Sequence, residues 1–154
     1  MAPDPASPPG AWRPTTSRKR LQARARLLAN VRHFFVRRGV LEVETPALST
    51  AGNSDPGIIQ FETTDGRWLR TSPEYAMKRL LAAGSGDIYE LGRVFRAGEA
   101  GAWHNPEFTL LEWYRVGWRF DQLMDEVAAL VAHCGEPLGR RWRVRKVRYR
   151  DWVH

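Results

Sequence analysis

Apolar residues between positions 17 and 38 recur at steps of three and four, which is the period of an amphipathic helix. The stripe consists of Leu21, Ala25, Leu28, Val31 and Phe35. Ser17 or Thr16 can cap the first amides, and Gly39 can end the helix because glycine tolerates a left-handed backbone. The pattern therefore predicts a helix over residues 17–38.

The segment after this helix carries the pattern of short strands and turns. We expect a strand at residues 40–45, a loop at 47–57 and a hairpin formed by 58–63 and 67–71. Pro46 ends the strand because proline has no amide to donate to a sheet. The dipeptide Asp65-Gly66 supplies the positive φ angles of a tight hairpin turn.

A short helix and a pair of longer strands follow. Ser72-Pro73-Glu74 has the cap, the proline and the first-turn acid of a helix start, so we expect a helix over residues 73–83. Residues 88–96 and 108–118 are rich in β-branched and aromatic side chains. They predict two antiparallel strands joined by a long loop.

The last helix is expected at residues 121–134, capped by Asp121 and ended by Gly135. Its buried face would consist of Met124, Val127, Ala128, Val131 and Cys134. Residues 140–150 are expected to add an edge strand, since Arg and Lys protect exposed sheet edges.

Together these elements predict an α+β fold in which helices flank an antiparallel sheet. The domain would occupy residues 17–154. Residues 1–16 hold five of the ten prolines and show no apolar period, so we expect a mobile leader there.

Length and composition narrow the class of protein. A chain of 154 residues has room for one domain. The single cysteine, Cys134, cannot form an intramolecular disulfide and is expected in the core. The sequence shows neither a secretory signal nor an apolar run long enough to cross a membrane. These features favour a cytoplasmic protein without a membrane partner.

Charge is distributed unevenly, so the formal net charge of +7 is misleading. Residues 1–38 carry nine bases and one acid, and residues 140–154 carry seven bases and one acid. Residues 39–139 carry eight bases and fifteen acids, a balance that favours a cationic ligand. The basic face of the first helix leaves two alternatives open, a solvated surface or contact with nucleic acid.

The polar residues of the long hairpin are the best candidates for chemistry. Arg96 at the end of one strand can grip a phosphate, and Phe108 at the start of the next can stack on an aromatic ring. Glu112 and Tyr114 are two residues apart, so they share a face of their strand and suit an ammonium group. Trp113 points to the other face.

Structural roles compete with these functional ones. Arg96 and Glu112 could form a cross-strand ion pair, and His104 could be an exposed loop residue. Glu74 could simply stabilise the start of its helix. The residue pattern alone leaves these alternatives open.

Three segments match a known family in order and spacing: GVLEVETP at residues 39–46, SPE at 72–74, and a stretch from 95 to 109 that begins FR and ends HNPEFT. In these segments the chain resembles the class II lysyl-tRNA synthetases, with the first segment similar to motif 1 and the hairpin similar to motif 2. The tripeptides Ser72-Pro73-Glu74 and Glu112-Trp113-Tyr114 resemble the short paralogues that attach lysine, preferably β-lysine, to elongation factor P more than they resemble the full synthetases. Too few residues precede the first helix for an anticodon-binding barrel.

The resemblance implies a homodimeric ligase that uses ATP to activate lysine or β-lysine as an adenylate and transfers it to a lysine of elongation factor P. It implies an ATP site that contains Arg96, Ala97, Gly98, Glu99, His104, Asn105 and Phe108. Arg96 would be the catalytic residue on the α-phosphate. The amino-acid site implied by the resemblance contains Ser72, Pro73, Glu74, Glu112 and Tyr114.

Two departures from the family pattern shape this expectation. The family usually has Asn-Glu after the motif 2 arginine, where this chain has Ala97-Gly98. After Trp118 we find neither the glycine-rich third motif, which covers the other face of the adenine, nor the acidic Mg²⁺ ligands of the complete enzyme. We therefore expect the N-terminal portion of a catalytic domain, inactive alone. The alternatives are a lysyl-tRNA synthetase that charges tRNA and a non-catalytic binding or dimerisation module.

Overall fold

The computed structural model of the chain describes residues 13–98, 101–142 and 144–152. Its elements, in chain order, are α1 (Arg18–Val36), β1 (Leu41–Glu42), β2 (Leu48–Ser49), β3 (Trp68–Leu69), α2 (Glu74–Ala82), β4 (Ile88–Phe95), β5 (Glu107–Tyr114), α3 (Phe120–Gly135), the 3₁₀ turn η1 (Glu136–Leu138) and α4 (Tyr149–Trp152). Most of the expected leader, residues 1–12, lies outside the described residues. No helix in the described part of the chain is long and apolar enough to span a membrane.

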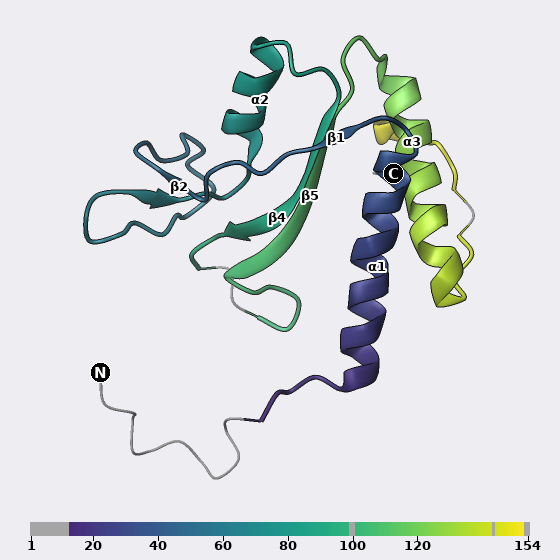
Figure 1. Ribbon diagram of the computed structural model, residues 1–154, viewed down its shortest axis with the longest axis horizontal. Coiled ribbons are helices and arrows are strands. Elements are labelled where there is room, and N and C mark those ends of the chain that lie inside the picture. The colour runs from purple at the N-terminus through teal and green to yellow at the C-terminus, as the bar shows by residue number, and fades with distance from the viewer. Residues whose placement is uncertain (1–12, 99–100, 143, 153–154) are drawn as a thin grey trace.

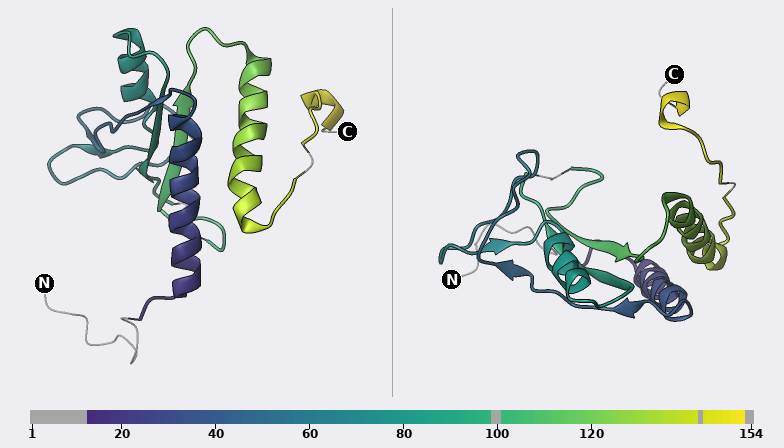
Figure 2. Two further views of the ribbon diagram at one scale, coloured as in Figure 1. Left: turned by 45° about the vertical axis from the view of Figure 1, so that its right-hand side comes forward. Right: turned by 90° about the horizontal axis from the view of Figure 1, so that it is seen from above.

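The larger sheet has the strand order β1-β4-β5, with α1 and α3 lying side by side next to it (Figures 1 and 2). β4 and β5 are antiparallel over eight residue pairs, from Ile88 opposite Tyr114 to Phe95 opposite Glu107. β1 pairs with β4 in parallel, so the sheet is mixed and the expected antiparallel arrangement holds only for the hairpin. A parallel pair is possible here because the long connection between β1 and β4 contains β2, β3 and α2.

α1 confirms the first expected helix. Ser17, and not Thr16, is its cap, since the Ser17 hydroxyl accepts a hydrogen bond from the Arg20 amide at 3.3 Å. Val31 and Phe35 are buried as the stripe predicted, and the Phe35 ring stacks on Tyr89 with centroids 4.5 Å apart.

The stripe is covered only in its second half. Leu21 is 54% exposed and Ala25 is exposed as well, because the N-terminal half of α1 extends past the end of the β4–β5 hairpin (Figure 1). Buried Val31 and Phe35 pack within the chain against Tyr89 and Leu130. These two residues are therefore covered within the chain itself.

Replacing Ser17 by alanine should lower the free energy of unfolding by about 1 kcal/mol, since it removes the side-chain acceptor at the start of α1. Chemical denaturation followed by circular dichroism measures this change. Thr16→Ala is the matched control and should have no effect. Equal losses for the two variants would show that the hydroxyl of Ser17 does not act as the cap.

The segment between β1 and α2 differs from expectation in two places. The strand expected at residues 40–45 ends at Glu42, because the Thr45 amide donates to the Glu90 carboxylate at 3.1 Å and not to a neighbouring strand. The expected hairpin forms its turn, with Gly66 at φ +78°, and its arms meet in an antiparallel bridge between Glu62 and Trp68. β3 also pairs with β2, which lies inside the expected loop at 47–57. Two-residue strands are too short to show a period, so the sequence could not reveal them.

α3 begins at Phe120, and its exposed residue Asp121 pairs with Arg119 and does not cap the helix. The side chain of Gln122 instead accepts a hydrogen bond from the Arg119 amide at 2.9 Å. The expected buried face is wrong in part, since Val127 and Val131 are each 40% exposed. The described residues of α3 that are buried are Glu126, Leu130 and Gly135. Cys134 is half-buried at the edge of the core, and this burial raises the pKa of its thiol.

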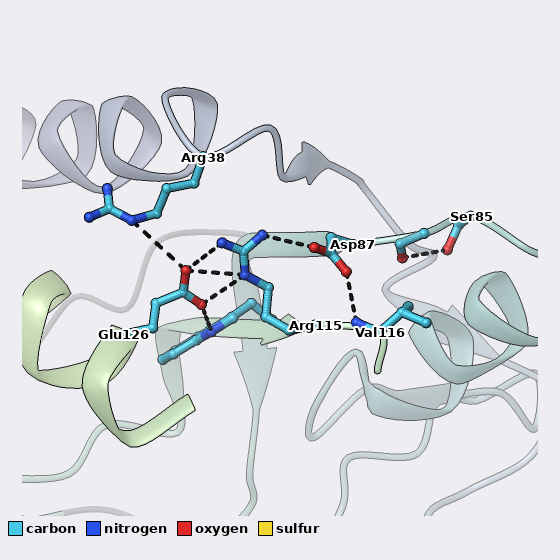
Figure 3. Close-up of polar contacts among 8 residues, drawn as sticks. Arg38, Ser85, Asp87, Arg115, Val116 and Glu126 are labelled. Carbon is cyan, nitrogen blue, oxygen red and sulfur yellow. Dashed lines mark hydrogen bonds and ion pairs between the residues drawn. The ribbon is translucent and has the colours of Figure 1, made fainter. Parts of the chain in front are cut away.

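Glu126 is buried because it meets a buried arginine. Arg115, which follows β5, donates to both oxygens of Glu126 and to Asp87 at the start of β4 (Figure 3). The side chains of Arg115 and Glu126 are only 6% and 2% exposed. Trp113 adds a hydrogen bond to Glu126 at 3.1 Å. This network attaches α3 to the end of the hairpin.

Two expected strand segments are absent from the described residues. β5 ends at Tyr114 and not at residue 118, because the Val116 amide turns to the Asp87 carboxylate at 2.7 Å and Gly117 adopts a positive φ. The expected edge strand at 140–150 is not paired in its described part, which ends in the short helix α4. The tail contacts α3 through Trp142, which packs against Gly135.

Candidate active site

The two faces of the β4–β5 hairpin have different partners. Side chains alternate between the faces of a strand, and the register places odd-numbered residues of both strands on one face. That face carries Tyr89, Leu91, Leu111 and Trp113, which pack against α1 and α3. The other face carries Glu90, Arg96, Phe108, Glu112 and Tyr114. The candidate site residues of the hairpin therefore gather on the side away from the core.

Glu112 is held by two hydroxyl groups. Ser72 donates to one carboxylate oxygen at 2.7 Å, and Tyr114 donates to the other at 2.6 Å. Burial, and then the hydrogen bond to Glu112, raise the pKa of the Tyr114 phenol, which keeps it protonated as the donor. Each carboxylate oxygen has two lone pairs, so both oxygens can still accept from a bound ammonium group.

No described lysine or arginine lies within ion-pair distance of Glu112. The residue opposite it in the register, Glu90, is 2% exposed and pairs with Arg70. Of these two facing carboxylates, Glu90 is therefore neutralised by a described arginine and Glu112 is not. The cross-strand ion pair between Arg96 and Glu112 that the sequence left open does not form, because the register sets them six residues apart along the sheet.

Arg96 lies just beyond the end of β4 and points back toward the segment before α2. Its Nε donates to the Thr71 carbonyl at 3.3 Å, and its guanidinium lies 5.2 Å from the centre of the Phe108 ring. Because Thr71 contacts Arg96 and the adjacent Ser72 contacts Glu112, one dipeptide joins the two ends of the candidate site. The Arg96 guanidinium and the Glu112 carboxylate are thus held in one framework.

The start of α2 supplies a second carboxylate. The Glu74 amide, the first in α2, donates to the Ser72 hydroxyl at 3.1 Å, while the hydroxyl proton of Ser72 goes to Glu112. Pro73 is buried between them and occupies the N-cap position that was expected for Ser72, so α2 begins one residue later than expected. The Glu74 carboxylate pairs with Lys78 at 2.5 Å, one helical turn away. Both roles of Glu74, helix start and site carboxylate, remain compatible with this position.

A hollow of about 100 Å³ opens beside Ser72 and Glu74 on the α2 side. Asn53 and Tyr75 line it, and Asn53 links them to Thr71 through hydrogen bonds of 3.0 and 3.1 Å. Neither Arg96 nor Glu112 lines this hollow. Ser72 lines the hollow and also contacts Glu112. We therefore regard the hollow as an extension of the candidate site and not as its centre.

The remaining residues of the expected ATP site lie around the hairpin loop. The Ala97 amide donates to the Ile59 carbonyl at 2.9 Å. Gly98 has a φ of +79°, which explains the glycine at this position. His104 and Asn105 are exposed. Glu99 lies outside the described residues.

Sequence reasoning missed the ion pair between Arg70 and Glu90 beneath the candidate site. Arg70 donates to the Arg93 carbonyl at 2.9 Å and to the Thr45 carbonyl at 2.8 Å, besides its ion pair with Glu90. Gly92 leaves room for it, because a Cβ there would lie 2.5 Å from the guanidinium. The only available signal was the position of Arg70 two residues before Ser72.

Among the described residues, no three His, Cys, Asp or Glu side chains come together as metal ligands would.

Residues 11–148 match the family of class II tRNA synthetases of the D, K and N type. The chain therefore belongs to this family, as its motifs 1 and 2 predicted. It is 52% identical over 136 residues to the elongation factor P–(R)-β-lysine ligase of Vibrio vulnificus strain YJ016, a match that covers 80% of this chain and 42% of the relative. The protein of the same name from Yersinia enterocolitica is 52% identical over 130 residues, which cover 79% of this chain and 40% of the relative. The chain thus spans about two fifths of the length of these relatives.

Proposed function

We propose that this chain carries the motif 1 and motif 2 part of a ligase that activates lysine or β-lysine with ATP and transfers it to a lysine of elongation factor P. The observation that supports this most directly is the Thr71-Ser72 dipeptide, which contacts Arg96 on one side and Glu112 on the other. Such a framework holds an amino acid by its ammonium end and a nucleotide by its phosphate end. The names of the 52% identical relatives supply the acceptor.

In the first step the carboxylate of the amino acid attacks the α-phosphorus of ATP, and pyrophosphate leaves with the bonding electrons. Arg96 would stabilise the charge on the α-phosphate, and Phe108 would stack on the adenine. Glu112, with Tyr114 and Ser72, would hold an amino group of the substrate, and Glu74 would lie near the other.

In the second step the neutral amine of the acceptor lysine attacks the acyl carbon of the adenylate. An amide bond forms, AMP leaves, and the amine gives up a proton. The protein chiefly positions the reactants and stabilises charge in such chemistry, so no covalent enzyme intermediate is required. We also propose that the active form is a homodimer, as the family resemblance implies.

The function is best tested in a chimera in which residues 13–135 replace the corresponding part of the Vibrio vulnificus relative. This chimera should attach lysine or β-lysine to elongation factor P, measured by the mass of the acceptor. Arg96→Ala should lower the rate by about 100-fold or more, because it removes charge stabilisation at the α-phosphate. Arg93→Ala, on the other face of the same strand, is the matched control and should retain activity.

The alternatives give different results in the same assay. A chimera that charges tRNA and leaves elongation factor P unmodified would favour the tRNA synthetase alternative. We expect the 154-residue chain alone to show no lysine-dependent pyrophosphate exchange. Exchange by the chain alone that Arg96→Ala abolishes would show that this half of the site is sufficient.

A further inference from the structure

The N-terminal half of α1 bears a concentrated positive charge. Within residues 18–26 the basic side chains are Arg18, Lys19, Arg20, Arg24 and Arg26, and there is no acid. All five are exposed, and no described acidic side chain lies within ion-pair distance of any of them. We call these five residues the α1 basic surface.

This charge opposes the helix that carries it. Arg18, Lys19 and Arg20 occupy the first three positions of α1, where the helix dipole and the free amides favour negative side chains. The first turn contains no acid. A merely solvated helix would gain stability from acids at these positions, so the bases call for a reason outside the helix.

The α1 basic surface lies beside the β4–β5 hairpin, whose opposite face carries the candidate active site. The Arg24 guanidinium donates at 2.7 Å to the hydroxyl of Thr109, which follows Phe108 on β5 and points to the other face of the strand. The first turns of α1 continue past the end of the β4–β5 hairpin (Figures 1 and 2). A macromolecule docked on this half of α1 would therefore also meet the open end of the hairpin.

We propose that the α1 basic surface is a docking site for an acidic face of the protein acceptor, an inference that rests on the proposed function. The surface favours a protein partner over RNA for two reasons. Leu21, which is 54% exposed, places an apolar contact among the bases, as protein interfaces do. No Phe, Tyr, Trp or His lies between positions 13 and 32 to stack on bases.

Charge reversal tests the docking site in the full chain. The double variant Arg20→Glu/Arg26→Glu should weaken the binding of elongation factor P by about tenfold or more at low salt, and the difference should shrink as salt is added. Binding is measured by titration calorimetry or surface plasmon resonance. The matched control is Arg145→Glu/Arg148→Glu, which makes the same change of charge at exposed positions of the C-terminal tail and should bind like the original chain.

The melting temperature separates a docking role from a folding defect, because a folding defect would lower it. Arg20→Glu places an acid three residues after the cap Ser17, which completes a capping box and should keep or raise the melting temperature. Weaker binding together with unchanged or higher thermal stability therefore identifies a docking role.

Four outcomes would overturn the proposal. Unchanged binding after reversal, or equal losses for the α1 and tail variants, would mean that this surface does not dock the acceptor. Loss of tRNA binding with elongation factor P binding unaffected would assign the surface to RNA. If the original chain does not bind elongation factor P at low salt, the proposal also fails. Failure of the proposed function is seen separately, because the chimera would then not modify elongation factor P at all.

Discussion

Replacing Glu90 by alanine should lower the free energy of unfolding by about 3–5 kcal/mol, because it leaves the Arg70 guanidinium in the interior without its carboxylate. The side chains of Arg70 and Glu90 are 10% and 2% exposed, so water replaces little of the lost interaction. Thr45 also loses an acceptor, since both its amide and its hydroxyl donate to Glu90. Urea denaturation followed by circular dichroism measures the change.

The matched control is Glu107→Ala, which breaks the pair with Arg93 on the same hairpin. Both side chains of that pair are more than half exposed, so the loss should stay below about 1 kcal/mol. Glu90→Gln, which keeps one acceptor oxygen for Thr45 and removes the charge that pairs with Arg70, should fall between the two. Similar losses for Glu90→Ala and Glu107→Ala would show that the buried pair contributes no more than a surface pair.

The Arg70–Glu90 pair also explains why a site can form at this place. Arg70 ties β4 to the Thr45 backbone and to the segment that leads into α2. Thr71 and Ser72 follow directly, and they contact Arg96 and Glu112. The buried pair thus holds the Thr71-Ser72 dipeptide against the sheet while neutralising the carboxylate opposite Glu112. We expect loss of Glu90 to impair ligand binding through this dipeptide as well as stability.

Local patterns predicted the parts of the structure that depend on neighbours in the sequence. The Ser17 cap, the extent of α1 and the turn at Gly66 each depend on a few adjacent residues, and each is confirmed. The shared face of Glu112 and Tyr114 follows from the two-residue period of a strand, and their hydrogen bond confirms it.

Contacts between distant segments set the features that the sequence did not predict. Glu126 faces inward because Arg115 is buried beside it, and no helical period can show that partner. The position of Glu90 opposite Glu112 depends on the register of β4 and β5, which a long loop does not fix. The hydroxyl of Ser72 was expected as a helix cap, whereas its link to Glu112 spans 40 positions of the chain.

Glu112→Gln should weaken lysine binding by about 100-fold or more while leaving ATP binding nearly unchanged, in this chain or in the chimera. An ammonium group removed from water needs an anionic partner, and the loss of a buried partner costs about 3–5 kcal/mol, where each 1.4 kcal/mol is a factor of ten. Glutamine preserves the shape and the acceptor for Ser72, so the framework should remain. Titration calorimetry with each ligand separates the two effects.

The matched control for this prediction is Glu107→Gln, which removes the same charge from the other face of β5. It should leave lysine binding intact, because the total negative charge of the middle segment is not what selects the ligand. Tyr114→Phe should give a smaller loss than Glu112→Gln, since it removes a donor to the carboxylate and keeps the charge. Equal losses of lysine and ATP binding in Glu112→Gln would mean that Glu112 supports the hairpin and not the substrate. If lysine binding depends on Glu112 and not on Glu107, the uncompensated carboxylate opposite the Arg70–Glu90 pair is the determinant of substrate charge.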